Sequence, residues 1–204
     1  LASNIEKNKA FYADVKGRMA KYGRDPSDLK IMPGIVINVG ETRAEAEARA
    51  QELVDVMHPE VGLLMLQEFL ETDLHGADRM PAKAKGSVAM FAGVKEFVEQ
   101  GHSLRELITH YARAHTGNGL TGSYIEVADF MQQWFEEEAA DGFILMCPTL
   151  PSSLEDFTRL VVPELRRRGL FREGYEGRTL RENLGLSFPA NRYTAARLAG
   201  PSSD

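Results

Sequence analysis

The sequence predicts an α/β fold that is mostly helical and contains few strands. Two short segments, residues 29–40 and 142–147, are largely apolar without polar alternation, which is typical of strands buried on both faces of a parallel sheet. A helical pattern follows each of them, as a crossover between parallel strands requires. Two strands make a very small sheet, and the pattern therefore indicates a portion of a larger α/β protein.

The chain opens with an amphipathic helix at residues 4–22, whose apolar positions recur at helical spacing and which Gly23 is placed to cap. A turn at residues 24–28 leads into the first strand. Pro33 and Gly34 are unfavourable inside a strand, so we expect a late start, a bulge or an edge position for this segment.

A run of helices separates the two predicted strands. Residues 41–57 carry acidic side chains early and alanine throughout, which favours a helix, and a second helix begins after Pro59. Residues 74–86 predict a loop, followed by helices at 87–100 and 103–114, the latter with a capping-box spacing between Ser103 and Glu106. The glycine-rich, polar residues 115–123 predict another loop.

The last third of the chain repeats the strand–helix order. Residues 123–140 predict a long amphipathic helix that starts with a second capping box, and the strand at 142–147 follows. A helix at 152–169 comes next, in which Pro163 predicts a kink, and the tail from residue 170 has the composition of a loop. The predicted apolar face of the 123–140 helix comprises Ile125, Val127, Ala128, Met131, Trp134 and Phe135.

At 204 residues, with 43% hydrophobic and 26% charged residues, the chain fits one ordinary globular domain. A net charge of −6 argues against a nucleic-acid backbone as the partner. The sequence shows no apolar run as long as a membrane span and no secretory signal pattern. The single cysteine, Cys147, excludes an intrachain disulfide framework and is compatible with a reducing cytoplasm, so we expect a cytoplasmic protein.

Three segments carry a resemblance to a known family: "AFYADVKGRMAKYGRDPSDLKIMPGI" at residues 10–35, "EEEAADGFILMCPTLPSSLEDFTRLVVPELRRRGLFREGYEGRTLRENLGL" at residues 136–186, and "PANRY" at residues 189–193. They resemble the C-terminal half of flavin-dependent monooxygenases of the nitrilotriacetate monooxygenase component A group. That group includes dibenzothiophene-sulfone and pristinamycin-type relatives and lies within the bacterial luciferase superfamily. The resemblance covers nearly the whole chain and is most specific at its two ends.

The resemblance implies a fold, because members of this group are about twice as long as this chain and form a (β/α)8 TIM barrel with insertions. Residues 31–40 would be barrel strand seven and residues 142–147 strand eight, with the first six strands upstream of Leu1. Residues 1–204 would then be the C-terminal part of one barrel domain, with a helical insertion and loops at 59–122 and a C-terminal tail at 170–204. The two predicted strands would be adjacent and parallel.

The resemblance also implies an activity for the intact protein. The group uses reduced FMN, supplied by a separate NAD(P)H-dependent flavin reductase, and O2 to form a flavin C4a-(hydro)peroxide that oxygenates a small organic substrate. A homo-oligomer is implied as well. Because the main flavin contacts of the group lie upstream of Leu1, no cofactor-binding residue is assigned in this chain, and the portion alone is expected to be inactive.

Candidate site residues follow from their positions. His115 precedes the glycine-rich loop, in "AHTGNGLTGSYIEVAD", where members of the group often carry "GH" ahead of "VGTPEQVAD"; this loop is about two residues longer. The resemblance implies a pocket histidine acting as acid or base, and an exposed loop histidine is the alternative. Met146, Cys147 and Pro148 end the second strand, where barrels place their chemistry, and are expected to form an apolar wall near substrate. Packing in the strand alone explains Ile144 and Leu145.

Other candidate groups have plainer interpretations. Cys147 fits a small buried hydrophobe better than a nucleophile, and residues 117–119 fit a flexible connection better than a phosphate loop. Trp134 and Phe135 are expected in the core. No metal site is expected, because no ligand spacing relates Cys147 to the remaining histidines, which are His58, His75, His102 and His110.

Two alternatives to the monooxygenase remain open. The first is another enzyme of the luciferase superfamily, such as a deazaflavin-dependent or other flavin-dependent oxidoreductase. The second is a non-enzymatic helical module that binds a partner protein through its long helices. The identity of the substrate does not follow from the sequence.

Overall fold

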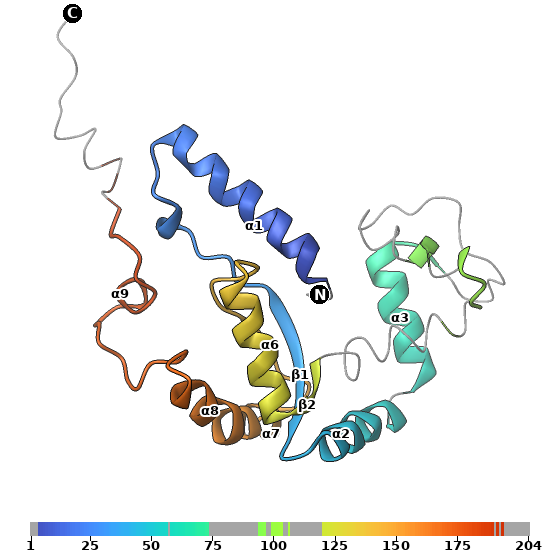
Figure 1. Cartoon of the computed structure of the whole chain (residues 1–204). Coiled ribbons are helices and arrows are strands. Elements are labelled where there is room, and N and C mark those ends of the chain that lie inside the picture. Colours follow the sequence, from blue (N-terminus) through green and yellow to red (C-terminus); the bar gives the residue numbers. More distant parts are fainter. Residues whose placement is uncertain are drawn as a thin grey trace, which may run out of the picture.

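The computed structural model describes residues 4–56, 58–73, 94–96, 99–103, 106, 120–189, 191 and 193. Within these residues a small parallel sheet carries helices on one face, and the chain runs on into α3 on one side and into the C-terminal segment on the other (Figure 1). The predicted loop at 74–86 lies wholly outside the described residues, as do most of the predicted helices at 87–100 and 103–114 and His115.

The sheet has three parallel strands in the order β2-β1-β3. β1 is Gly34–Gly40, β2 is Leu120–Ser123 and β3 is Ile144–Met146. β1 pairs with β3 from Gly34↔Ile144 to Val36↔Met146, so the predicted adjacency of the two strands is confirmed. The late start after Pro33 is also confirmed, whereas an edge position is wrong because β1 is the central strand.

β2 corrects the prediction that residues 115–123 form only a loop. Residues 120–123 pair with the carboxyl-terminal half of β1, from Ile37↔Leu120 to Gly40↔Ser123. The sequence Leu-Thr-Gly-Ser has little intrinsic preference for a strand. Its conformation comes from backbone pairing with a distant segment, which a local pattern does not reveal.

The first three helices of the chain agree with the expected ranges. α1 spans Ile5–Met19, followed by the 3₁₀ turns η1 at Ala20–Tyr22 and η2 at Pro26–Asp28. Gly23 caps the first of these turns in the left-handed conformation, at φ 62°. After β1 come α2 at Arg43–Asp55 and α3 at Pro59–Leu70. At the predicted capping box of the 103–114 segment, the backbone N–H of Glu106 donates to Ser103 Oγ at 3.2 Å.

The helices after β2 include a π-helical segment directly before Pro163 and one short helix that the sequence did not predict. α6 spans Tyr124–Glu136 and begins with the predicted capping box of Ser123 and Glu126. α7 at Ser152–Asp156 continues through the π-helical η3 at Phe157–Val161 into α8 at Val162–Arg167. Pro163 has no N–H to donate to the preceding turn, and the wide π turn directly before it accommodates this loss. The tail contains a short helix, α9 at Leu180–Asn183, where only a loop was expected.

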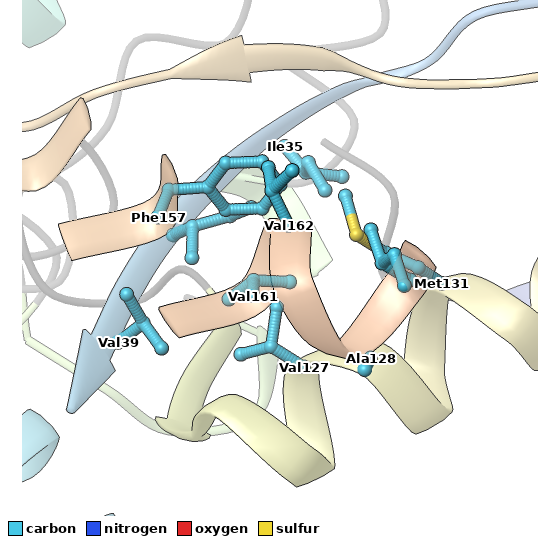
Figure 2. Packing of buried hydrophobic residues seen from close by; sticks show 10 residues of the cluster. Ile35, Val39, Val127, Ala128, Met131, Phe157, Val161 and Val162 are labelled. Atoms are coloured by element: carbon cyan, nitrogen blue, oxygen red, sulfur yellow. The ribbon is translucent and has the colours of Figure 1, made fainter. Parts of the chain in front are cut away.

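The main core lies between one face of β1 and the helices α6, η3 and α8. Alternate residues Ile35, Ile37 and Val39 of β1 point toward these helices and are buried. Figure 2 shows this packing, with the strand side chains facing Phe157, Val161 and Val162 and the residues Val127, Ala128 and Met131 of α6. We call this the outer face of the sheet. Trp134 is buried beside Ala139 and Ala140, as expected for a core residue.

Phe135 was predicted to belong to the core but is 53% exposed. It lines the rim of a groove of 730 Å³ that separates α6 from the C-terminal segment. Residues 169–172 line the same groove, so the side of α6 that carries Phe135 faces an open space.

Among the described residues, no helix is both long and apolar enough to cross a membrane.

A cluster of polar contacts around Asp141, Ile31 and Lys16, which we call the polar latch, connects the amino ends of β1 and β3. The Asp141 carboxylate accepts a hydrogen bond from the backbone N–H of Ile31 at 2.7 Å, and the Asp141 N–H donates to the Ile31 carbonyl at 2.8 Å. Lys16 Nζ lies 3.0 Å from the same carboxylate and also donates to the carbonyls of Pro26 and Leu29. The latch thereby ties α1 and the turn after it to the start of both strands.

Candidate functional site

The carboxyl ends of the three parallel strands meet at one edge of the sheet, at Gly40, Ser123 and Met146. In a barrel of parallel strands this edge carries the chemistry, and the opposite edge contributes to stability. The candidate site therefore consists of the side chains that point inward near this edge, together with the loop that leaves β3.

The inner face of the sheet is defined by alternation along the strands. Since Ile35 and Leu145, which are paired in register, both pack against the outer core, Val36 and Met146 must share the other face. The thioether of Met146 lies over Gly34, where a Cβ atom would approach the sulfur to 3.2 Å. Gly34 thus makes room for Met146 to lie along the inner face.

Two of the inward residues of β3 are exposed. Met146 is 43% exposed and Ile144 is 57% exposed. Assigning Ile144 to core packing was therefore wrong for this chain, since among the described residues the helices cover only the outer face. Leu145 does pack against the outer core, as expected.

Cys147 and Pro148 continue the chain beyond β3, and both are half-buried. Burial raises the pKa of the Cys147 thiol, so the group stays protonated near neutral pH. A protonated thiol is a poor nucleophile, and this supports the interpretation of Cys147 as part of an apolar wall. Among the described residues, no three His, Cys, Asp or Glu side chains come together as a metal site.

Sequence reasoning missed Asn38, a neutral polar residue two positions before the carboxyl end of β1. Asn38 is only 6% exposed, and its Nδ2 donates to Thr121 Oγ1 of β2 at 3.3 Å. The two residues are partners in register, so both point to the inner face. A polar residue inside an otherwise apolar strand was the signal that could have drawn attention to this position.

A hydroxyl cluster shapes the loop that leaves β3. Thr149 Oγ1 lies 2.7 Å from both Ser152 Oγ and Ser153 Oγ, and the backbone N–H of Thr149 donates to Ser153 Oγ at 3.1 Å. These contacts close the turn between β3 and α7. They fix the path of Cys147 and Pro148 over the edge of the sheet.

Ion pairs between the surrounding helices connect them to the carboxyl edge of the sheet. Arg43 of α2 pairs with Glu126 of α6 at 2.7 Å, and its Nη1 also donates to the Thr121 carbonyl of β2 at 3.4 Å. The guanidinium of Arg43 and the hydrogen bonds from Ser123 lower the pKa of Glu126 to about 2. β2 is therefore fastened to α2 on one side and to the start of α6 on the other.

A second set of ion pairs joins α2 to the segment after β3. Arg49 Nη1 donates to the Val39 carbonyl at 3.1 Å and pairs with Asp156, which also accepts from Arg159 Nη2 at 2.9 Å. These contacts hold α2 and α7 against the end of β1.

The structure brings some of the candidate residues together and leaves one untested. Met146 shares the inner face with the pair Asn38 and Thr121, and Cys147 and Pro148 follow it over the edge. His115 lies outside the described residues, so its role stays a prediction. The 730 Å³ groove lies elsewhere, since it is lined by Lys30, Asp141 and Gly142, which precede the strands, and by the C-terminal segment.

A strip of parallel strands with helices on its outer face and an apolar wall at the carboxyl edge is the arrangement expected of one segment of a (β/α)8 barrel. The model of the luciferase-like monooxygenase family matches residues 1–139, and the chain belongs to this family. The predicted resemblance and the predicted fold class are thereby confirmed.

Individual relatives agree with this assignment. The chain is 44% identical over 191 residues to nitrilotriacetate monooxygenase component A from Aminobacter aminovorans, covering 90% of this chain and 42% of that protein. It is 34% identical over 204 residues to dibenzothiophene-sulfone monooxygenase from Rhodococcus erythropolis, covering 93% of this chain and 44% of that protein. The chain thus spans less than half the length of these relatives.

A solved structure shows the same fold with a flavin. The crystal structure of riboflavin lyase with modified FMN and the substrate riboflavin matches with a TM-score of 0.74 at 26% identity, over 90% of this chain and 41% of that chain. The coverage agrees with a C-terminal portion of the barrel.

Proposed function

We propose that the intact protein is a two-component monooxygenase that uses reduced FMN and O2 to oxygenate a small organic molecule. The observation that carries this proposal is the 44% identity to nitrilotriacetate monooxygenase component A over nearly the whole chain. The name of that relative designates one component of a system, which supports a separate NAD(P)H-dependent flavin reductase as the partner.

The inner face of the sheet fits a flavin enzyme of this kind. Its side chains from β1, β2 and β3 are uncharged, and Ile144 and Met146 form an exposed apolar surface beside the buried Val36. When bound, reduced FMN supplies the electrons that activate O2. An apolar wall beside it excludes water and gives an organic substrate a surface to lie against. The phosphate of FMN needs cationic or amide donors, and we assign these to the strands upstream of Leu1.

Each candidate residue has a role in this proposal. Met146, Cys147 and Pro148 form the substrate-facing wall where β3 leaves the sheet. We also propose that His115 donates or accepts a proton at the substrate, which its place ahead of the glycine-rich loop in the family pattern supports. We further propose that the protein acts as a homo-oligomer, as the family resemblance implies, and that it is cytoplasmic, which its single cysteine supports.

The test uses the intact protein with FMN, NADH, a flavin reductase and ¹⁸O2. We expect reductase-dependent incorporation of one labelled oxygen atom into an organic probe, with nitrilotriacetate and dibenzothiophene sulfone as the first two probes. Omitting the reductase should abolish the reaction. A protein that binds reduced deazaflavin but not reduced FMN would point to the deazaflavin-dependent alternative, and one that binds neither would sink the enzyme proposal.

A further inference from the structure

Met146 is the most exposed methionine in the described part of the chain. Its side chain is 43% exposed, whereas Met19 and Met131 are buried in the core and Met32 and Met65 are half-buried. Met146 is also the last residue of β3, at the carboxyl edge of the sheet. In a barrel enzyme this edge holds the reactants, so the exposed thioether lies where the chemistry takes place.

The pairing of the strands fixes the side to which this thioether points. Met146 pairs with Val36 of β1, and both side chains belong to the inner face. A Cβ atom at Gly34 would lie 3.2 Å from the Met146 sulfur and 3.9 Å from its Cγ, so the side chain lies over the bare backbone of β1. Its exposed part is therefore the part turned away from the sheet, toward the interior of the barrel.

A thioether beside flavin chemistry is an oxidisable group. Reduced FMN that meets O2 without a substrate passes two electrons and two protons to it, which yields oxidised FMN and H2O2. The lone pair of a methionine sulfur takes one oxygen atom from a peroxide, the O–O bond breaks, and the other oxygen leaves as water. The sulfur is thereby oxidised to a sulfoxide while the peroxide is reduced. No proton has to leave the sulfur first, so the reaction proceeds at neutral pH.

Two other sulfur atoms could compete for the peroxide. Cys147 reacts as the thiolate, but burial raises the pKa of its thiol and keeps the group protonated near neutral pH. Met32 lines the groove near the amino end of β1, at the edge of the sheet opposite to the reactants. A peroxide held beside a group reacts far faster than the same peroxide in dilute solution, so position favours Met146 over Met32.

We propose that Met146 is an oxidative modification site: in the absence of an organic substrate, the peroxide formed from reduced FMN and O2 converts its thioether to a sulfoxide. This inference rests on the proposed function. A sulfoxide is polar, so the modification interrupts the apolar wall and lowers turnover. A bound organic substrate covers the wall and takes the oxygen itself, so Met146 is spared. The oxidation thus switches off enzyme that runs without substrate.

The experiment follows the sulfur atoms of the intact protein by mass spectrometry. The protein is incubated with FMN, NADH, a flavin reductase, ¹⁸O2 and catalase, without an organic substrate. We expect labelled sulfoxide at Met146 at least about tenfold above that at Met32, because catalase removes peroxide from solution but not from the site. Omitting NADH should leave both methionines unmodified. Adding nitrilotriacetate or dibenzothiophene sulfone, whichever is oxygenated, should lower the sulfoxide at Met146.

Turnover of that probe is then measured relative to the initial rate of each variant. Wild type and the matched control Met32→Leu should lose turnover as the sulfoxide accumulates, and methionine sulfoxide reductases should restore it. Met146→Leu has an apolar side chain of similar volume that carries no sulfur. It should keep its own initial rate throughout the incubation, whatever that rate is.

Several results overturn the inference. Sulfoxide at Met146 that does not exceed the level at Met32, or that catalase abolishes, shows that only peroxide in solution reaches the sulfur. Oxidation of Cys147 ahead of Met146 assigns the reaction to the thiol. A protein that binds reduced FMN and leaves Met146 unmodified contradicts the inference, whether or not it oxygenates a probe, and leaves the flavin site intact. A protein that binds no reduced FMN and oxygenates no probe overturns the proposed function itself.

Discussion

Near the amino ends of β1 and β3, charged side chains connect segments that are far apart in the sequence. Asp141 accepts hydrogen bonds from Ile31 and from the Tyr12 hydroxyl, and it pairs with Lys16, which is 9% exposed. Burial and the nearby Asp141 carboxylate raise the pKa of Tyr12 to about 12, so the phenol stays a donor. A buried ion pair contributes little net stability, but removing one partner leaves the other charge uncompensated.

Lys16→Met should therefore destabilise the protein by about 3 kcal/mol, because the Asp141 carboxylate loses its counter-ion inside the structure. Urea denaturation of the intact protein measures the change. Lys9→Met is the matched control: Lys9 pairs with Glu137 at 2.8 Å, but both side chains are more than one-third exposed, and solvent replaces the partner. Equal losses for the two variants would contradict the role assigned to burial.

Glu126 makes stability depend on pH in the acid range. Its pKa is about 2 in the folded protein against 4.5 for the free side chain, first because of Arg43 and then because of Ser123. A depressed pKa contributes stability that is present above pH 4.5 and is lost as the pH falls toward 2. Because the carboxylate is partly exposed, salt should weaken the contribution.

Glu126→Gln should lower the Tm at pH 7, and the difference from wild type should shrink as the pH falls from 5 to 2. Thermal unfolding across this range measures both. Glu136→Gln, on the same helix, is the control, since Glu136 accepts a hydrogen bond from the neutral side chain of Gln132 and has no ion-pair partner among the described residues. A difference that stays constant with pH would exclude titration of Glu126 as the cause.

At the scale of elements, the turn from β1 into α2 depends on a close approach of two backbones. A Cβ atom at Gly40 would lie 2.9 Å from both the backbone N of Ala46 and the Thr42 carbonyl oxygen. Backbone atoms within a capped helix turn do not move aside easily. Gly40 therefore allows α2 to start directly at the carboxyl edge of the sheet, where Arg43 and Arg49 make their contacts.

Gly40→Ala should destabilise the protein by about 2 kcal/mol through overpacking, and it should lower activity by displacing the β1–α2 turn. Gly17→Ala is the matched control, since Gly17 lies within α1 and a Cβ atom there meets nothing within 4 Å. That change should stabilise by roughly 0.5–1 kcal/mol, because alanine loses less conformational entropy in a helix. Denaturation curves of the two variants should thus shift in opposite directions.

At the scale of the whole molecule, the sequence predicted the elements whose signals are local. The apolar runs revealed β1 and β3, and the spacing of Ser123 and Glu126 revealed the start of α6. β2 was missed because its strand conformation comes from pairing with β1. The exposure of Phe135 and Ile144 was missed because it depends on which surfaces neighbouring segments cover.

For the candidate site as well, the sequence predicted the features with local signals and missed the contacts between distant segments. The position of Met146, Cys147 and Pro148 follows from strand order, and their place at the carboxyl edge could be predicted. The pair of Asn38 and Thr121 joins residues 83 positions apart in the sequence. Its members become recognisable as partners only when the register of β1 and β2 is known.

The inner face leads to a final prediction about the intact barrel. Ile144 is 57% exposed in this chain, and β3 belongs to a sheet whose helices cover only its outer face among the described residues. Since the family fold closes such strands into a barrel, side chains from the other strands should cover Ile144 in the intact protein. An ammonium group at this position would then be buried without a partner.

Ile144→Lys should consequently destabilise the intact protein by about 3 kcal/mol or more, far beyond the effect expected of an exposed isoleucine. Val56→Lys is the matched control, because Val56 is 76% exposed at the end of α2, away from the sheet, and should tolerate the charge. Thermal unfolding and flavin binding of both variants provide the measurement. If Ile144→Lys proved as harmless as Val56→Lys, the inner face would remain open to water in the intact protein, and the barrel could not exclude water from this wall as the proposed flavin chemistry requires.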